Sequence, residues 1–264
     1  MFRVCRGIVR LSEKITVDTF KGDLHNHTVL SPCGDIEMTP AFMVLKAVAE
    51  HFDFFAVTDH NTTLQCEQIL PIARREGIKV FCGAELNTSE EVHCVALVED
   101  EERLAELQKF LDGHLPHIEN DVDKFGYQLV VNEAEEILYQ APYLLINALD
   151  VGIDECEKFV HSLGGIFYPA HVDRTGYSVI SQLGFIPPDL SIECIEFSKN
   201  CKWQAFLERP ENAYLKRYNC IRSSDAHYPE DFATVSCRFT MEEPTFAELK
   251  MALRGENGRK VEIV

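Results

Sequence analysis

The 264-residue sequence lacks any long hydrophobic run, and this absence sets the first limit on its class. It contains no stretch of roughly 18 apolar residues that could cross a bilayer. Its first residues, MFRVCRGIVRLSEK, also lack the apolar segment of a secretory signal. We therefore expect no membrane partner and a cytoplasmic location.

Paired cysteines are missing as well, although the chain has 10 cysteines. None forms a Cys-x-x-Cys pair, so a structural zinc held by four cysteines is not expected. Their wide spacing in a chain of this length also argues against a disulfide framework. Most stand within apolar runs, where we expect reduced thiols in the core.

Positive charge is scarce, because the sequence contains 25 Lys and Arg residues but 43 Asp and Glu residues. The net charge is −18, and three divalent cations would still leave the chain at −12. A nucleic-acid platform needs a basic stripe, which the sequence does not contain. We therefore expect a small molecule or a short strand as the substrate rather than a long duplex.

No Gly-, Pro- or Ser-rich linker and no repeat divides the chain, so we expect one domain over residues 1–264. Short apolar runs predict strands at 52–60, 79–86, 92–98, 164–171, 191–197 and 219–227. Amphipathic patterns predict helices at 39–51, 62–77, 152–165 and 245–255. This alternation predicts a parallel α/β fold, and residues 100–150 read as a helical excursion from it.

Histidines and carboxylates follow four of the predicted strands. They are Asp59, His60, Glu85, His171, Asp225 and His227. In an α/β barrel the carboxyl ends of the strands form the active-site face, so these side chains should converge. His25 and His27 would join them from the first strand, where alternate residues share a face. His93 opens its run instead, so either its strand is antiparallel or a loop returns it to the site.

The mixture of imidazoles and carboxylates indicates a metal site. Without clustered thiolates, the ligand types favour Zn, Mn or Fe. The ligands are too many for one tetrahedral ion, so we expect two or three divalent metals sharing a bridging carboxylate. Sites of this kind activate water and hold a phosphate during its displacement.

Five motifs resemble the polymerase and histidinol phosphatase (PHP) family. In chain order they are DLHNHT, TDHN, GAELN…EVHCVAL, PAH and SDAH, over roughly residues 20–240. The resemblance implies a distorted seven-stranded β/α barrel, TIM-like, with two or three divalent metals at its mouth. It also implies hydrolysis of phosphoesters.

The resemblance assigns ligands to three metal positions. The ligands of the first would be His25, His27, Glu85 and Asp225. The second would share Glu85 and add His93 and His171. The ligands of the third would be Asp35, His60 and His227. Asp23 and Asp59 would hold histidine ligands in place.

The stretch HTVLSPCGD departs from the family, which often has Ser-Asp-Gly shortly after its His-x-His motif. We favour Asp35 as the ligand here, with the thiolate of Cys33 as the alternative. An acidic ligand at this position resembles the nucleotide phosphatase and 5′→3′ exonuclease members more than the histidinol phosphatases.

The expected reaction is attack of a metal-bridging hydroxide on phosphorus, with Glu85, Asp225 and His227 as the catalytic set. Arg174 and Lys199 are candidate clamps, because Arg grips phosphate bidentately and Lys acts as a point charge. A base could stack on an aromatic ring. The candidate rings are Phe167, Tyr168, Tyr177, Trp203 and Tyr228.

Several functions stay open at this point. The favoured one is a phosphoesterase acting on nucleotides or short 5′-phosphorylated oligonucleotides. The alternatives are a phosphatase of sugar or amino-alcohol phosphates, a non-catalytic metal-binding module, and a metal-dependent hydrolase of C–N bonds. The sequence does not separate phosphatase from exonuclease, and it leaves the native metal and the oligomeric state open.

Overall fold

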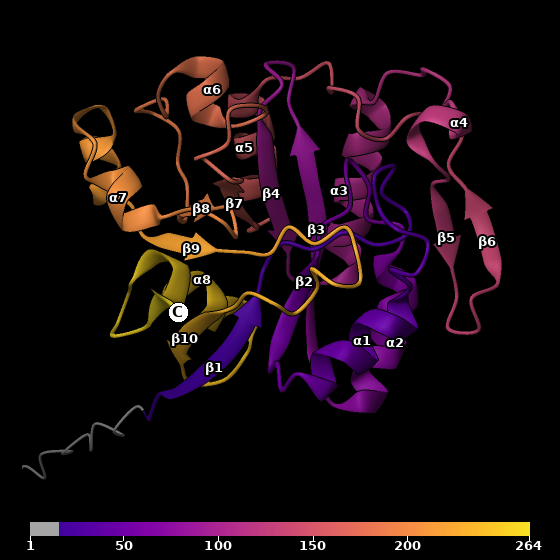
Figure 1. Cartoon of the computed structure of the whole chain (residues 1–264), viewed down its shortest axis with the longest axis horizontal. Helices are drawn as coiled ribbons and strands as arrows, with labels where there is room; N and C mark the ends of the chain where they lie inside the picture. Colours follow the sequence, from indigo (N-terminus) through magenta and orange to yellow (C-terminus); the bar gives the residue numbers. More distant parts are fainter. Residues whose placement is uncertain (1–15) are drawn as a thin grey trace, which may run out of the picture.

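The computed structural model describes residues 16–264 (Figure 1). The N-terminal stretch on which we based the absence of a secretory signal lies outside the described residues, as does Cys5. Among residues 16–264, every helix is too short or too polar to pass through a lipid bilayer.

The strands are β1 (Asp18–Asp23), β2 (Phe54–Val57), β3 (Lys79–Asn87), β4 (His93–Val98), β5 (Leu129–Val131), β6 (Ile137–Gln140), β7 (Ile166–Pro169), β8 (Ile195–Phe197), β9 (Cys220–Arg222), β10 (Cys237–Met241) and β11 (Lys260–Ile263). The helices are α1 (Pro40–Ala49), α2 (Cys66–Glu76), α3 (Glu101–His114), α4 (Val122–Phe125), α5 (Ile153–Ser162), α6 (Val179–Leu183), α7 (Trp203–Leu207), the 3₁₀ helix η1 (Pro210–Arg217) and α8 (Phe246–Arg254).

Seven strands form one curled sheet in the order β11-β10-β1-β2-β3-β4-β7. This sheet with its covering helices confirms the predicted α/β, TIM-like seven-stranded fold. The expectation of a parallel sheet is wrong for this sheet, because within it only β1, β2 and β3 pair in parallel. Residues 88–92 are too few for a crossover, so β4 folds back against β3 as an antiparallel partner.

Two smaller sheets flank the large one. The parallel pair β8–β9 is shorter than the predicted strands at 191–197 and 219–227. The excursion at 100–150 is not purely helical, because the antiparallel pair β5–β6 follows α3 and α4. Figure 1 shows β5 and β6 at one side of the molecule and β8 and β9 toward the other.

Local signals explain the main helices. The side chain of Thr39 accepts a hydrogen bond from Phe42 N, and Pro40 occupies the first turn of α1. Thr245 caps α8 in the same way, and Gly255 ends it in the left-handed region with φ 68°. Pro71 lies inside α2.

Four strands of the large sheet, β2, β3, β4 and β7, are buried on both faces. Along β2, Phe55 and Val57 join one hydrophobic cluster, whereas Phe54 and Ala56 join the other. Residues of α1 and α2 pack on one face, and residues of α8 and β9 pack on the other, which explains the continuous apolar run in the sequence. The polar side chains are thereby confined to the strand ends.

Candidate metal centre

Strand ends bring the predicted ligands together. Glu85 lies near the end of β3, and His60 follows β2 and forms a parallel bridge with it. His25 and His27 follow β1, where Asn26 bridges to Ala226 next to Asp225. The position of His93 is also explained, because antiparallel pairing sets the start of β4 beside the end of β3.

Glu85 is the centre of the cluster and is 1% exposed. Five imidazole nitrogens surround its carboxylate. Its Oε1 lies 3.0 Å from His93 Nδ1, 3.1 Å from His171 Nε2 and 3.3 Å from His25 Nε2. Its Oε2 lies 3.1 Å from His60 Nδ1 and 3.3 Å from His27 Nε2. A carboxylate placed in this way can bridge two cations.

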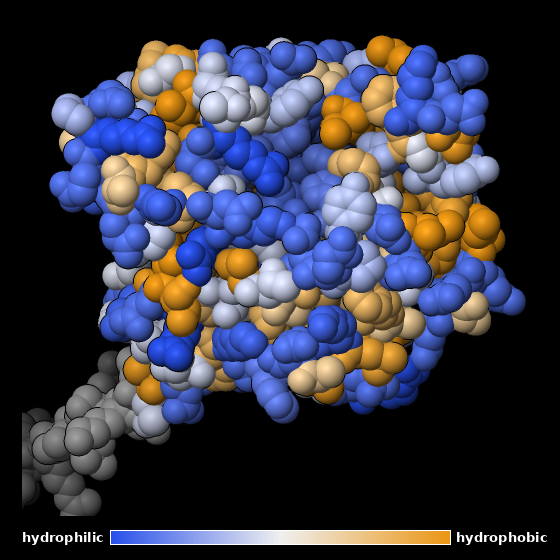
Figure 2. Space-filling model, in the orientation of Figure 1, coloured by the Kyte–Doolittle hydropathy of each residue, from blue (hydrophilic) through white to orange (hydrophobic). Residues whose placement is uncertain are grey.

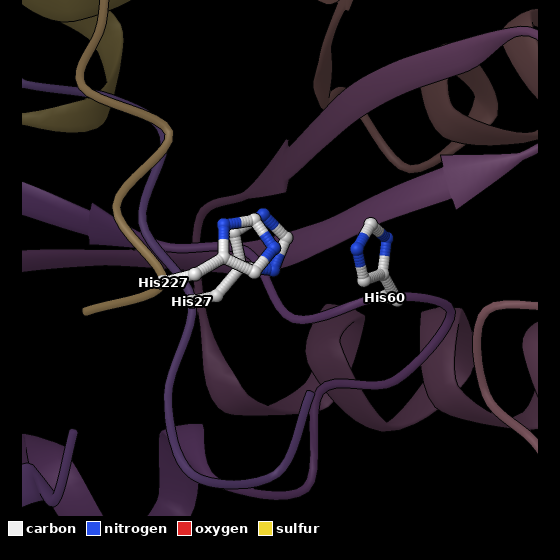
Figure 3. Close-up of side chains that lie close together, drawn as sticks. All are labelled: His27, His60 and His227. Atoms are coloured by element: carbon white, nitrogen blue, oxygen red, sulfur yellow. The ribbon is translucent and has the colours of Figure 1, made fainter. Parts of the chain in front are cut away.

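Residues 16–264 contain three groups of candidate ligands, and within each group all ligand atoms lie within 4.8 Å of one another. The first is His25, His27, Glu85 and Asp225, as the resemblance implied. The second is His60, Glu85 and His93. His171, which the resemblance assigned to this position, is in none of the three groups, but its Nε2 lies 3.1 Å from Glu85 Oε1. The third is His27, His60 and His227. Figure 3 shows the stacked rings of His27 and His227 with His60 across from them.

Several buried ligand atoms make no hydrogen bond within the described chain. They are Glu85 Oε2, Asp225 Oδ1, His60 Nδ1 and His93 Nε2. Buried polar atoms that form no hydrogen bond are rare and need an explanation. Imidazole and carboxylate donors suit Zn, Mn or Fe, so divalent cations fit this donor set.

The charges of the cluster suit metal binding. Burial alone would raise the pKa of Glu85, but the surrounding His93, His25 and His60 hold it well below its usual value. Burial lowers the pKa of His60 well below its usual value. Burial and the nearby His27 lower the pKa of His227 to about 4. An ionised carboxylate and a neutral imidazole are the states that bind a metal, and the pKa shifts of Glu85, His60 and His227 are in that direction.

Glu196 is a member of the site that the sequence analysis missed. Its side chain is fully buried, and its Oε1 lies 3.0 Å from His25 Nδ1. It also accepts a hydrogen bond from the backbone N of His171. Burial lowers the pKa of His25, but Glu196, Glu85 and Asp225 together raise it well above its usual value. Glu196 thereby fixes the ring with Nε2 facing the cluster.

Asp59 and Asp23 act less directly than predicted. Asp59 accepts a hydrogen bond from Ser31 Oγ at 2.7 Å. Ser31 Oγ in turn lies 2.9 Å from His27 Nδ1. Ser31, which the sequence analysis also missed, therefore stands between the carboxylate and the ring. Asp23 accepts from the backbone N of Ser224 and of His25, so it joins two ligand-bearing segments rather than orienting a ring.

Asp35 lies next to the cluster but outside the three ligand groups. Its carboxylate accepts a hydrogen bond from Glu37 N at 2.8 Å, while its own N donates to His227 O. Cys33, the alternative, is exposed. Its thiol pKa is raised to about 12 by desolvation and by the charges of Glu85 and Asp225.

The two predicted clamps lie in different surroundings. Arg174 reaches the cluster, because its Nη2 lies 2.5 Å from Asp225 Oδ2 and its side chain is 43% exposed. Lys199 Nζ lies 2.5 Å from Asp231 Oδ1, which is not a ligand atom of the cluster. Arg174 is therefore the better placed of the two.

The candidate stacking rings also separate. Phe167 and Tyr168 belong to the core, and Trp203 packs against it. Tyr177 and Tyr228 are 46% and 47% exposed. The ring of Tyr177 stacks on that of His93 with centroids 4.8 Å apart, so it borders the cluster.

Backbone strain gathers around the cluster. Asn61, His171, Tyr177 and Asp225 have φ values of 48°, 29°, 57° and 50°. The left-handed region is unfavourable for residues with side chains and recurs at functional sites. Four such residues beside one cluster are therefore consistent with a functional site.

A family model described as PHP domain matches residues 23–160. The sequence matches no curated protein.

Solved structures share the fold. A lesion-specific endonuclease, endonuclease Q from Pyrococcus furiosus, is 17% identical with a TM-score of 0.68. The match covers 92% of this chain and 58% of the endonuclease, so the chain spans little more than half of its length.

A structure of endonuclease Q with a 27-mer duplex that carries an abasic lesion gives a TM-score of 0.65 at 17% identity, with the same coverage. A putative metal-dependent phosphoesterase from Bifidobacterium adolescentis is 17% identical with a TM-score of 0.53. That match covers 78% of this chain and 87% of the phosphoesterase. At these identities the likeness shows the fold alone.

Proposed function

The chain belongs to the PHP domain family, and on that premise we propose that it is a metal-dependent phosphoesterase. Proteins of this family depend on metals. One observation carries the proposal: Glu85 is buried within 3.3 Å of five imidazole nitrogens, and its Oε2 makes no hydrogen bond within the described residues. This arrangement supports a bridging ligand for two or three divalent cations, with Zn, Mn and Fe as the candidates.

The chain's own residues would divide the work between holding cations and holding phosphate. The bound cations would activate water and neutralise charge on the phosphoryl oxygens. Glu196 would keep His25 oriented, and Asp59 would do the same for His27 through Ser31. We place Asp35 near the third cation position, where it could contribute directly or through water.

Arg174 is the residue that we propose to hold the substrate phosphate. Its guanidinium is partly exposed and already paired with Asp225 at the edge of the cluster. It can therefore turn one side toward a phosphate while the other stays on the carboxylate. The ammonium group of Lys199 would attract the substrate phosphate from a longer distance.

We propose nucleotides or short 5′-phosphorylated oligonucleotides as substrates, with sugar and amino-alcohol phosphates as the alternative. The expectation that long duplexes are excluded loses its support, because a structure with this fold holds a 27-mer duplex. Net acidic charge alone does not decide the point. The proposal includes a cytoplasmic location, since the widely spaced cysteines suit a reducing compartment.

The test is to incubate the Mn²⁺-loaded protein with three substrates and identify the products over time. These are a 5′-phosphorylated trinucleotide, ribose 5-phosphate and a duplex with an abasic lesion. Mononucleotides released stepwise indicate an exonuclease, inorganic phosphate indicates a phosphatase, and internal cleavage indicates an endonuclease. Protein that holds its metals and gives no product from any of the three contradicts the proposal.

A further inference from the structure

A cavity of about 300 Å³ lies beside the metal cluster. Its apolar walls are Phe125, Leu144 and Ile146, and Tyr177 lines it as well. Asn87 and Asn147 provide the amide groups of the lining. We call this space the amide cavity.

One ring contact and one shared strand face connect the amide cavity to the cluster. Tyr177 lines the cavity and stacks on His93, one of the ligands. Asn87 lies two positions after Glu85 in β3, so the two side chains leave the same face of the strand. A molecule with one end at Glu85 can therefore extend into the cavity.

Asn87 and Asn147 provide one hydrogen-bond acceptor and one hydrogen-bond donor that form no hydrogen bond within the described residues. Asn87 is 2% exposed and its Oδ1 has no hydrogen-bond partner among the described residues. Its Nδ2 donates to Ile146 O at 2.8 Å, which fixes the orientation of the amide. The Nδ2 of Asn147 is also buried without a partner within residues 16–264. One buried acceptor and one buried donor are thus free to form hydrogen bonds with a ligand.

The charge of the amide cavity does not favour a second phosphate. Glu91 is the charged residue in its described lining, and the lining contains neither Lys nor Arg. An anionic group would be repelled, whereas an uncharged polar ring would not. Apolar walls with a few placed polar groups are typical of sites for flat organic rings.

We propose that the amide cavity binds the nucleobase of a nucleotide whose phosphate lies at the metal cluster. This inference rests on the proposed phosphoesterase function and names its substrate class. Asn87 Oδ1 accepts an N–H of the base edge, and Asn147 Nδ2 donates to a neighbouring ring nitrogen or carbonyl. Enzymes that read extruded bases use the same combination of edge hydrogen bonds and ring contacts.

The decisive variant is Asn147→Ala, because its amide nitrogen bonds to nothing in the described chain and its loss should not harm the fold. We expect kcat/KM for uridine and adenosine 5′-monophosphates to fall roughly five- to tenfold. The value for ribose 5-phosphate, which has no base, should not change. The exposed Asn200 offers a matched control, and Asn200→Ala should alter neither substrate.

An equal fall for nucleotides and ribose 5-phosphate, or no change for either, would overturn the base-binding role. Calorimetric titration of the Mn²⁺-loaded protein with uridine and adenosine separates this failure from that of the main proposal. Nucleoside binding that Asn147→Ala weakens supports the cavity even when no phosphoester is cleaved. Hydrolysis of ribose 5-phosphate with no nucleoside binding in any variant leaves the phosphoesterase and removes the base site.

Discussion

Glu196 illustrates how single residues make this site. It has no exposed surface, and it does not belong to any of the three ligand groups of the described chain. Instead its Oε1 lies 3.0 Å from Nδ1 of His25, on the side of the ring opposite the cluster, and fixes the orientation of the ring. Carboxylates in this position set the ring orientation and raise the basicity of the ligand nitrogen.

We predict that Glu196→Gln weakens metal binding by about 10- to 100-fold. The amide keeps the shape but loses the charge that supports His25. Competition with a chelator would measure the affinity. Glu193→Gln is the matched control, because Glu193 is equally buried but contacts His161 and Arg254. Equal affinities in the two variants would contradict the role.

The sequence predicted the cluster of candidate ligands and named Asp59 as a supporting residue, but it did not predict Glu196 or Ser31. Glu85 and His60 follow apolar runs, so their position at strand ends identified them. Glu196 lies inside the run SIECIEF, where a carboxylate carries no signal that separates function from a chance polar residue. Ser31 is equally unmarked, since its role depends on the fold of the loop between β1 and α1.

At the scale of elements, the hairpin β3–β4 positions Glu85 and His93. The two strands pair from Cys82 to Asn87, and Gly83 lies opposite Leu97. A Cβ on Gly83 would lie 1.8 Å from the carbonyl oxygen of Ala96. Only glycine allows the strands to approach this closely.

Gly83→Ala should therefore destabilise the protein by about 3 kcal/mol or prevent folding. Urea unfolding followed by circular dichroism would measure the change. Gly113→Ala is the control, because a Cβ there meets nothing within 4 Å and Gly113 lies in α3. That variant should gain about 0.5 kcal/mol. Similar stabilities of the two variants would refute the close-contact argument.

A second inter-element contact predicts a pH dependence. His161 of α5 contacts Glu157 and Glu193, and hydrogen bonding to Glu193 raises its pKa above the usual value. The stabilising charge is fully present below the unfolded-state pKa of about 6.5 and is lost as pH rises through the raised value. His161→Gln should therefore lower the free energy of unfolding more at pH 6 than at pH 9.

Urea unfolding of the wild type and of His161→Gln at the two pH values measures this difference. Arg254 also pairs with Glu193 at both pH values, so the carboxylate keeps one partner throughout. A loss of stability that is the same at pH 6 and pH 9 would show that His161 carries no charge in this contact.

For the whole molecule, the sequence predicted the architecture better than its details. Alternating apolar runs and helical patterns indicated the α/β fold correctly. They did not indicate β5–β6, because its strands are short and β6 exposes Ile137, Leu138 and Tyr139. Figure 2 shows hydrophobic residues at this side of the molecule, where Figure 1 places β6. A strand without a buried face has no alternating pattern for the sequence to reveal.

The sequence patterns also did not predict which distant strands pair with each other. Strand β1 lies between β2 and β10, which are separated by most of the chain. That pairing brings Asp225 and His227, near the end of the chain, to His25 and His27 near its beginning. Local patterns carry no information about such contacts, so the convergence was inferred from the rule for strand ends and from the family motifs.

The central claim is that Glu85 bridges catalytic metals. The most direct test measures bound metal by mass spectrometry and phosphoester hydrolysis on the same samples of wild type and Glu85→Gln. We predict two or three divalent ions per wild-type chain, and a parallel loss of metal and activity in the variant. A Glu85→Gln protein with full metal content and normal turnover would contradict the account.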